Sequence, residues 1–174
     1  AAELRTLLSL QGREQPYEDM HEWNMENVFK GDLTRAEAKK RIFAWLYNPD
    51  SHDELCEHAY DRRSILKKHY SHGRVKTIFG KTIESESRTA LNYIIQSTCA
   101  ENVLKQMIKL SNYLEGCKSY VAFPIHDSVV LDFSIEDKGR LGEIINLFSN
   151  TELGKFKVNV SVGTNFGNLK KLEV

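Results

Sequence analysis

Four residues recur at intervals of four between positions 35 and 47, in the order Arg35, Lys39, Phe43 and Tyr47. On an α-helix a step of four places side chains in one sloping stripe, here two cations followed by two aromatic rings. The stripe would rise roughly 18 Å, which is comparable with the length of a triphosphate, sugar and base. Cationic side chains form strong hydrogen bonds with phosphates, and aromatic rings can stack on a nucleotide base. The stripe therefore predicts a nucleotide-binding face; the alternative is an amphipathic helix that buries both rings.

Local signals support one helix over this stretch. Thr34 and Glu37 have the spacing of a capping box, in which the threonine accepts a backbone N–H and the glutamate reaches back to the cap. At the other end Asn48-Pro49 should stop the helix, because the residue before proline is pushed out of the α region. Both cations of the stripe then lie near the positive pole of the helix dipole, which makes sense if an anion binds there.

A second candidate group is Asp127. The run SYVAFPIHDSVVLDF has two apolar segments around His126 and Asp127, the pattern of a β-hairpin with a polar tip. If its arms are buried in a sheet, such a tip holds a carboxylate rigidly where a metal ion could reach it. The alternative is an aspartate that only forms the turn. A two-metal site needs at least two carboxylates from separate elements, so a second ligand must come from elsewhere.

The overall composition is that of an ordinary globular chain. Its 174 residues include 24 acidic and 24 basic side chains and 41% hydrophobic residues, which suits one domain or two closely packed lobes. The stretch from 35 to 81 is locally basic, as a nucleic-acid surface or a set of solvated helix faces would be. With no apolar run of membrane-spanning length, we expect no membrane contact. Three cysteines without metal spacing indicate reduced thiols in an intracellular protein: Cys56, Cys99 and Cys117.

The elements that must position these groups follow from periodicity and turn signals. We expect helices over 3–11, 19–30 and 34–47, one or two over 51–70, and another near 136–149. A long helix should run from Ser97 or Thr98 to Leu114, with Thr98 and Glu101 as a second capping box. RVKTIFGKTI reads as a short strand or hairpin, and KVNVSVG as a final strand. Together they predict an α+β fold, an antiparallel sheet backed by helices.

Five segments in order resemble the carboxyl-terminal part of a family A DNA polymerase. The resemblance covers nearly the whole chain, and its most specific piece is the stripe helix. The segments are AELR at 2–5, like the second half of motif A; R-x-x-x-K-x-x-x-F-x-x-x-Y at 35–47, like the fingers helix; TIFGK at 77–81; RTALNYIIQST at 88–98, like the opening of the long palm helix; and IHDSVVLDF at 125–133, like motif C. The closing VNVSVG is also similar to the family's last strand.

The resemblance implies a nucleotide site built around the stripe. Arg35 and Lys39 are similar to the pair that grips the triphosphate of the incoming deoxynucleotide, and His21 to a histidine that helps to hold the same phosphates. Phe43 resembles the ring that packs on the sugar and base.

Two further residues of the resemblance act near the sugar and the template. Tyr47 is similar to the tyrosine that fills the template slot until the fingers close, and Glu3 to the glutamate that lies under the sugar. Together, Glu3 and Tyr47 would leave no room for a 2′-hydroxyl.

The resemblance also implies contacts with primer-template DNA and metal. Arg88, Asn92 and Gln96 fall where the family contacts template and primer, and His126 where it contacts the primer terminus. Asp127 resembles the motif C aspartate that binds two catalytic Mg²⁺ ions, with Mn²⁺ as a possible replacement. By this resemblance, residues 1–13 belong to the palm, 14–87 to the fingers and 88–174 to the palm, in the cytoplasm of a bacterial or phage-infected cell.

Two departures qualify the resemblance. The motif A aspartate would precede Ala1, so we expect the polypeptide alone to be an inactive fragment that needs an upstream segment with the thumb and motif A, in the same or another chain. Ser128 stands where most relatives have glutamate, which removes a third carboxylate. Two alternatives remain: a single-subunit phage-type RNA polymerase, which Glu3 and Phe43 disfavour, and a noncatalytic nucleic-acid-binding relic.

Overall fold

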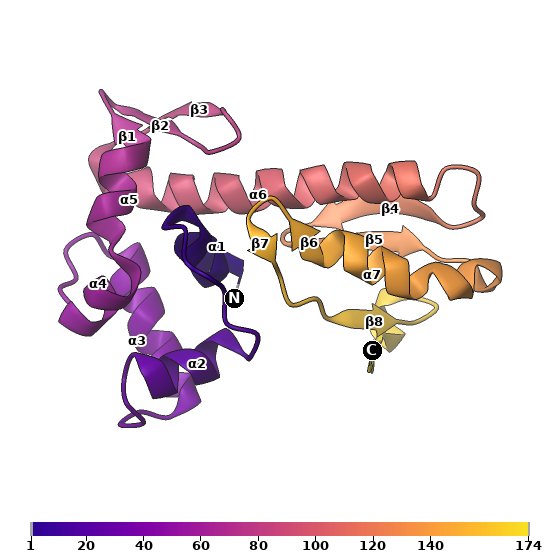
Figure 1. Ribbon diagram of the computed structural model, residues 1–174, viewed down its shortest axis with the longest axis horizontal. Coiled ribbons are helices and arrows are strands. Elements are labelled where there is room, and N and C mark those ends of the chain that lie inside the picture. The colour runs from indigo at the N-terminus through magenta and orange to yellow at the C-terminus, as the bar shows by residue number, and fades with distance from the viewer. Residues whose placement is uncertain (1, 174) are drawn as a thin grey trace. The chain divides into compact units, whose positions relative to one another are not determined.

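The computed structural model describes residues 2–173, which divide into two compact units (Figure 1). The division falls between Glu101 and Asn102, inside one long helix, α6 (Ser87–Tyr113). The boundaries expected from the resemblance, at 13/14 and 87/88, stay a prediction. The first and last positions of the expected domains, 1 and 174, lie outside the described residues.

The first unit is mainly helical. Five helices precede α6: α1 (Ala2–Leu10), α2 (Met20–Asn27), α3 (Arg35–Tyr47), α4 (Glu54–Tyr60) and α5 (Arg62–His69). A three-stranded antiparallel sheet follows α5, with the order β1 (Tyr70–Ser71), β2 (Arg74–Lys76), β3 (Thr82–Glu84). The expected hairpin at RVKTIFGKTI is β2 paired with β3.

One apolar cluster holds this unit together, because α1, α3 and the first part of α6 each turn one side inward. Burial of such side chains contributes roughly 1.5–3 kcal/mol each. The cluster's buried members include Leu4, Leu7 and Leu8 of α1, Ile42 and Trp45 of α3, Tyr60 of α4, and Ile94 and Ile95 of α6.

Side-chain caps fix where the helices begin. Thr34 and Glu37 form the expected capping box of α3. Asp19 caps α2 and Asp53 caps α4. Asp61 ends α4 and also caps α5, with a positive φ of 38° that makes the sharp turn between the two helices. The stretch 51–70 is therefore two helices.

The expected start of the long helix at Ser97 or Thr98 is wrong, because α6 begins at Ser87. Thr98 lies within the helix with no exposed surface, so its spacing to Glu101 is not a capping box. Ala90 and Ile94 on the preceding turns are fully buried. Their packing extends the helix through a local signal that would otherwise start one.

The second unit comprises the rest of α6 and the elements that follow it. They are β4 (Tyr120–Ile125), β5 (Ser128–Asp132), η1 (Ile135–Arg140), α7 (Leu141–Ser149), β6 (Asn150–Thr151), β7 (Gly154–Lys155), β8 (Val160–Val162), η2 (Phe166–Asn168) and β9 (Lys170–Leu172). All strand pairs are antiparallel, which confirms the α+β class. The expected final strand is β8, and it pairs with β9.

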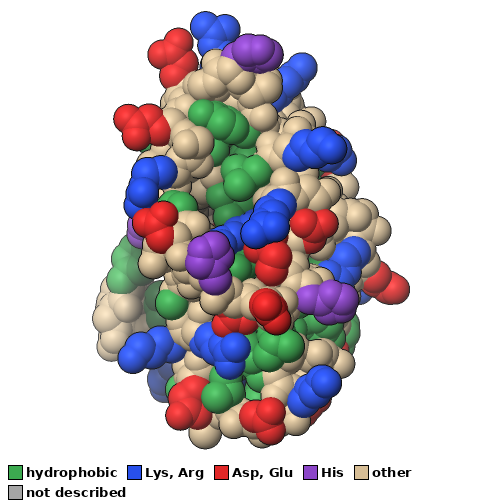
Figure 2. All heavy atoms as spheres, turned by 90° about the vertical axis from the view of Figure 1, so that its left-hand side faces the viewer, with side chains coloured by type: hydrophobic (Ala, Val, Ile, Leu, Met, Phe, Trp, Pro, Cys, Tyr) green, Lys and Arg blue, Asp and Glu red, His purple; other side chains and the backbone are tan. Residues whose placement is uncertain are grey.

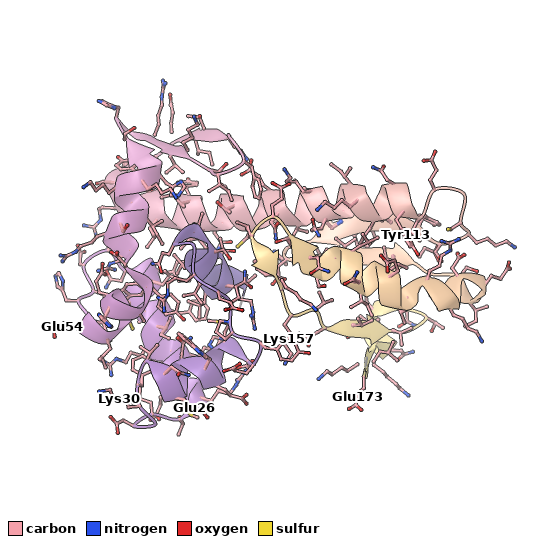
Figure 3. The ribbon with its side chains drawn as sticks, in the orientation of Figure 1. Glu26, Lys30, Glu54, Tyr113, Lys157 and Glu173 are labelled. Carbon is pink, nitrogen blue, oxygen red and sulfur yellow. The ribbon has the colours of Figure 1, made fainter. Side chains whose placement is uncertain are left out.

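The core of this unit lies between α6, α7 and one face of the β4–β5 hairpin. Leu110, Leu114 and Ile144 are buried, and Val121 and Leu131 pack against them. Near Tyr113, at the carboxyl end of α6 (Figure 3), the Arg140 guanidinium lies 5.6 Å from the tyrosine ring centre.

Gln106 ties α6 to the end of α7. Its buried amide Nε2 donates to the carbonyl oxygens of Leu147 at 2.5 Å and Asn150 at 2.8 Å.

The expectation that both hairpin arms are buried is wrong: no residue of β4 or β5 is fully buried, and β4 is the more exposed of the two. Phe123 is 43% exposed and Ile125 37% exposed. Each arm has one strand partner, the other arm, and the core cluster reaches Val121 and Leu131. Phe123 instead lies beside Phe166 of η2, with ring centres 6.3 Å apart.

Two other expectations concern the chain as a whole. No helix formed by residues 2–173 is long and apolar enough to cross a membrane. Within the same range, the three cysteines form no disulfide, as expected.

Candidate nucleotide site

The α3 stripe is mostly exposed, although Phe43 packs partly against the core. Arg35 and Lys39 are exposed, Phe43 is half-buried, and Tyr47 is 41% exposed. The buried side of α3 uses other residues, including Ile42 and Trp45. Since Tyr47 is outside the core and Phe43 only partly in it, the helix does not simply bury both rings.

Three rings lie next to one another near the cations, from the enclosed His21 to the exposed Tyr47. Phe43 and Tyr47 stack with ring centres 5.8 Å apart and an interplanar angle of 6°. His21, from α2, lies 5.8 Å from Phe43 at a tilt of 57°. These geometries fall within the range of favourable ring pairs. The structure thus brings His21 to the stripe, as expected for a shared site.

Groups from two other helices lie near the hydroxyl of Tyr47, at the end of the stripe. The Gln96 side-chain amide of α6 donates to the Tyr47 hydroxyl at 3.0 Å. Burial and the nearby Glu3 carboxylate of α1 raise the pKa of Tyr47, and the bond from Gln96 opposes them. Glu3 and Gln96 thus both lie near Tyr47; the proximity of Glu3 to Tyr47 was expected, and that of Gln96 was not.

The cationic end contains one paired and one unpaired side chain. Arg35 donates from Nε and Nη2 to the two carboxylate oxygens of Asp19, at 3.1 and 3.0 Å. Lys39 is exposed and makes no hydrogen bond or ion pair with the part of the chain that the structure describes. Positive charge that no carboxylate balances is thus centred on Lys39.

Asp19 has an unusual charge environment. Partial burial by itself would raise the pKa of this carboxyl, but the Arg35 guanidinium and the backbone N–H groups of Glu22 and His21 together hold that pKa well below its usual range. Asp19 therefore stays ionised at neutral pH.

His21 is mostly enclosed, with 6% of its surface exposed. Its Nδ1 has no hydrogen-bond partner among residues 2–173. Burial lowers the pKa of the ring, and the positive charges of Arg35 and Lys39 lower it further. We therefore expect a neutral imidazole at pH 7, which can donate one hydrogen bond to an anion without carrying a charge.

Three of the four residues expected to contact DNA share one side of α6. Arg88, Asn92 and Gln96 follow each other at intervals of four and are all exposed. Arg88 forms a 2.7 Å ion pair with Asp50, which lies just after α3. Both partners are largely exposed, so the pair is weak and open to exchange with a phosphate.

The β4–β5 hairpin presents His126 and Asp127 as its two loop residues. Ile125 and Ser128 form the last pair, and the Ser128 hydroxyl donates to the Ile125 carbonyl at 2.8 Å. His126 has a φ of 52°, a conformation that favours glycine and costs energy at histidine. Both loop side chains are exposed and make no hydrogen bond or ion pair within residues 2–173.

A complete metal centre is not formed by residues 2–173. No group of three or more His, Cys, Asp or Glu side chains in this range could hold an ion. Asp127 is a single carboxylate on the second unit, and its approach to the α3 stripe stays a prediction.

The locally basic stretch from 35 to 81 is less positive than its sequence suggests. Figure 2 shows acidic side chains interspersed with the basic ones on the face that it draws. Several arginines of the stretch are paired: Arg41 with Asp53, Arg62 with Glu57, and Arg74 with Glu84. Lys67, Lys68 and Lys76 remain exposed without an ion pair in the described chain.

Sequence reasoning missed Asp19 and Asp50, the carboxylates that pair with Arg35 and Arg88. Asp19 could have been noticed as the cap in front of MHEW, two residues before His21. Nothing in the spacing of Asp50 pointed to Arg88, 38 residues later.

Comparison with known proteins supports the fold. No protein-family model matches the sequence, and no curated protein matches it. Among solved structures, the chain is similar to the POL domain of Pol1 from M. smegmatis, in complex with DNA primer-template and dNTP. The TM-score is 0.67 with 17% identity over 86% of this chain and 35% of that one. The chain therefore spans about a third of that neighbour and shares the fold of part of a polymerase domain.

Proposed function

We propose that this chain is the nucleotide-binding and primer-contacting part of a template-directed DNA polymerase of family A. The stripe of α3 supports the proposal most directly. Lys39 is a cation without an ion pair among residues 2–173, and Phe43 and Tyr47, about one and two turns further along the same side, stack on each other. That order matches a nucleotide, with phosphates at one end and a base at the other. The fold shared with a polymerase domain gives the stripe a suitable context.

In this proposal Lys39 and Arg35 hold the phosphates of a deoxynucleoside triphosphate, with His21 as a neutral donor beside them. Phe43 packs on the sugar and base. Phosphoryl transfer depends mainly on positioning and charge neutralisation, which is what cations on a helix provide. Tyr47, fixed by Gln96, closes the far end of the site.

The primer and template bind along α6. Arg88, Asn92 and Gln96 face solvent from one side of the helix, and Arg88 exchanges Asp50 for a backbone phosphate. His126, strained at the hairpin tip, contacts the primer terminus.

Asp127 supplies one carboxylate to a site for Mg²⁺ or Mn²⁺, which needs at least one further carboxylate from another element. Such ions stabilise the attacking and leaving oxygens of phosphoryl transfer. The hairpin's contribution is to hold the Asp127 side chain at a fixed tip without an internal partner.

Lys39→Ala tests the proposal, with Lys40→Ala as the matched control. Both lysines are exposed on α3, and neither has an ion pair within residues 2–173, but Lys40 is off the stripe. Lys39→Ala should weaken deoxynucleotide binding roughly 10- to 150-fold, as expected for a lost bond between charged groups.

Affinity for primer-template duplex should change little in Lys39→Ala. Fluorescence titrations with nucleotide and with duplex, in the full natural protein, measure both quantities. Equal losses in the two titrations, or equal effects of the two lysine substitutions on nucleotide binding, would contradict the proposed role.

A further inference from the structure

We propose that Asp19 is a positioning residue for the nucleotide's phosphates: it fixes the Arg35 guanidinium so that its remaining donors face an incoming polyphosphate. This inference rests on the proposed function. It concerns a carboxylate that would at first sight repel the ligand.

The Arg35 guanidinium uses only some of its hydrogen-bond donors on Asp19. Asp19 accepts from Nε and Nη2 of Arg35 in a two-point contact of 3.1 and 3.0 Å. A guanidinium is planar and has five donors, so this contact leaves the Nη1 side unused. Nη1 has no hydrogen-bond partner within residues 2–173, and half of the Arg35 side chain is exposed. Arg35 can therefore keep Asp19 and bind a phosphate oxygen at the same time.

Asp19 is itself held firmly. One of its carboxylate oxygens accepts the backbone N–H groups of His21 at 2.9 Å and Glu22 at 3.2 Å, which makes it the cap of α2. The same oxygen also accepts the bond from Nε of Arg35. With four bonds on two oxygens, the carboxylate has little freedom to rotate.

One carboxylate thus connects both elements of the phosphate end. Asp19 lies at the start of α2, whose second residue is His21, and Arg35 is the first residue of α3. An arginine that is already ordered loses less side-chain entropy when it binds a ligand. The Arg35–Asp19 pair is also neutral overall, so Lys39 attracts the phosphates while Arg35 sets their orientation.

Asp19→Asn separates this role from helix capping, because asparagine is an equally good cap but carries no charge. We expect Asp19→Asn to weaken binding of a deoxynucleoside triphosphate to the protein–primer-template complex roughly 5- to 20-fold, as when one charge-assisted bond is replaced by a neutral one. Asp32→Asn is the control, since Asp32 is an exposed carboxylate in the loop between α2 and α3 with no ion pair among the described residues.

Combination with Arg35→Ala shows whether Asp19 acts through Arg35. In that background Asp19→Asn should cause no further loss of nucleotide affinity. Arg35→Lys keeps the charge but lacks the two-point contact, so it should lose affinity and become insensitive to Asp19→Asn. Thermal unfolding of each variant shows whether it is folded. If Asp19→Asn does not fold, Arg35→Lys still tests whether the two-point contact matters for nucleotide affinity.

Two results would overturn the inference. Tighter nucleotide binding by Asp19→Asn would mean that the carboxylate competes with the phosphates. An equal loss from Asp19→Asn with and without Arg35 would mean that it acts only on α2. If Lys39→Ala weakens nucleotide binding but Asp19→Asn does not, this inference fails and the proposed function stands; if Lys39→Ala has no effect, the proposed function fails as well.

Discussion

The α3 stripe of the first unit and the hairpin tip of the second differ in how their polar groups are held. In the stripe, Arg35 is paired with Asp19, Tyr47 with Gln96, and Phe43 with two neighbouring rings. At the tip, His126 and Asp127 have no side-chain partner within residues 2–173. The backbone of the tip is nevertheless well defined, because the Ser128–Ile125 bond closes the turn.

The stripe and the tip would therefore meet a ligand in different states, one already ordered by internal contacts and one exposed. The stripe is arranged by internal contacts before anything binds, so a ligand meets an ordered surface with one uncompensated charge, Lys39. The tip offers exposed groups on a strained turn, and strain of this kind often accompanies a binding role. Substitution should therefore affect the two regions differently.

The largest effect should come from the tip. Asp127→Ala should reduce nucleotide incorporation by roughly 10³-fold or more, because removal of a group that acts on the reacting atoms costs far more than loss of one binding contact. Thermal stability should change little, since the exposed Asp127 side chain has no hydrogen bond or ion pair with residues 2–173 to lose.

Glu143→Ala is the control, as an exposed carboxylate on α7 of the same unit. Primer extension with the full natural protein measures the effect. Retention of more than a tenth of the wild-type rate by Asp127→Ala would contradict the metal-binding role.

A second effect should appear at the far end of the stripe, where Glu3 lies near Tyr47. If Glu3 excludes a 2′-hydroxyl, Glu3→Ala should lower the preference for deoxynucleotides over ribonucleotides by roughly 10- to 200-fold, the range for a small steric difference in a pocket.

Incorporation of matched ribo- and deoxynucleotides by the full natural protein gives this ratio, with Glu14→Ala as an exposed control between α1 and α2. An unchanged ratio would remove the sugar-gate assignment. A wild-type preference for ribonucleotides would favour the RNA polymerase alternative.

The smallest effect concerns stability in the second unit. Gln106→Met keeps the size of the side chain but removes the buried amide that donates to the carbonyls of Leu147 and Asn150. The expected loss is about 1–3 kcal/mol of unfolding free energy.

Amide hydrogen exchange in α7 should increase in this variant, and the exposed Lys109→Met on the same helix should not change it. Unaltered exchange would show that Gln106 is dispensable for packing.

Much of the stripe could be predicted because its signals are local. The capping box and the proline fix both ends of α3, and a spacing of four then determines which side chains share a face. The β4–β5 hairpin could also be predicted, because the hydrophobic pattern of the sequence changes there to a period of two residues.

The features that were predicted wrongly or missed depend on packing between segments that are distant in the sequence. The start of α6 depends on burial of Ala90 and Ile94 in the first unit, which no local cap reveals. Exposure of β4 depends on which strands lie beside it. The Asp19–Arg35 pair joins residues 16 apart in sequence, and only the packing of α2 on α3 brings them together.

The most direct test of the central claim is an NMR titration of this chain with a deoxynucleoside triphosphate and, separately, with inorganic tripolyphosphate. The triphosphate should shift resonances at both ends of the α3 stripe, at Lys39 and at Phe43 and Tyr47, whereas tripolyphosphate should shift only the cationic end. Shifts confined to the exposed lysines of α5 and β2, with none along α3, would contradict the account.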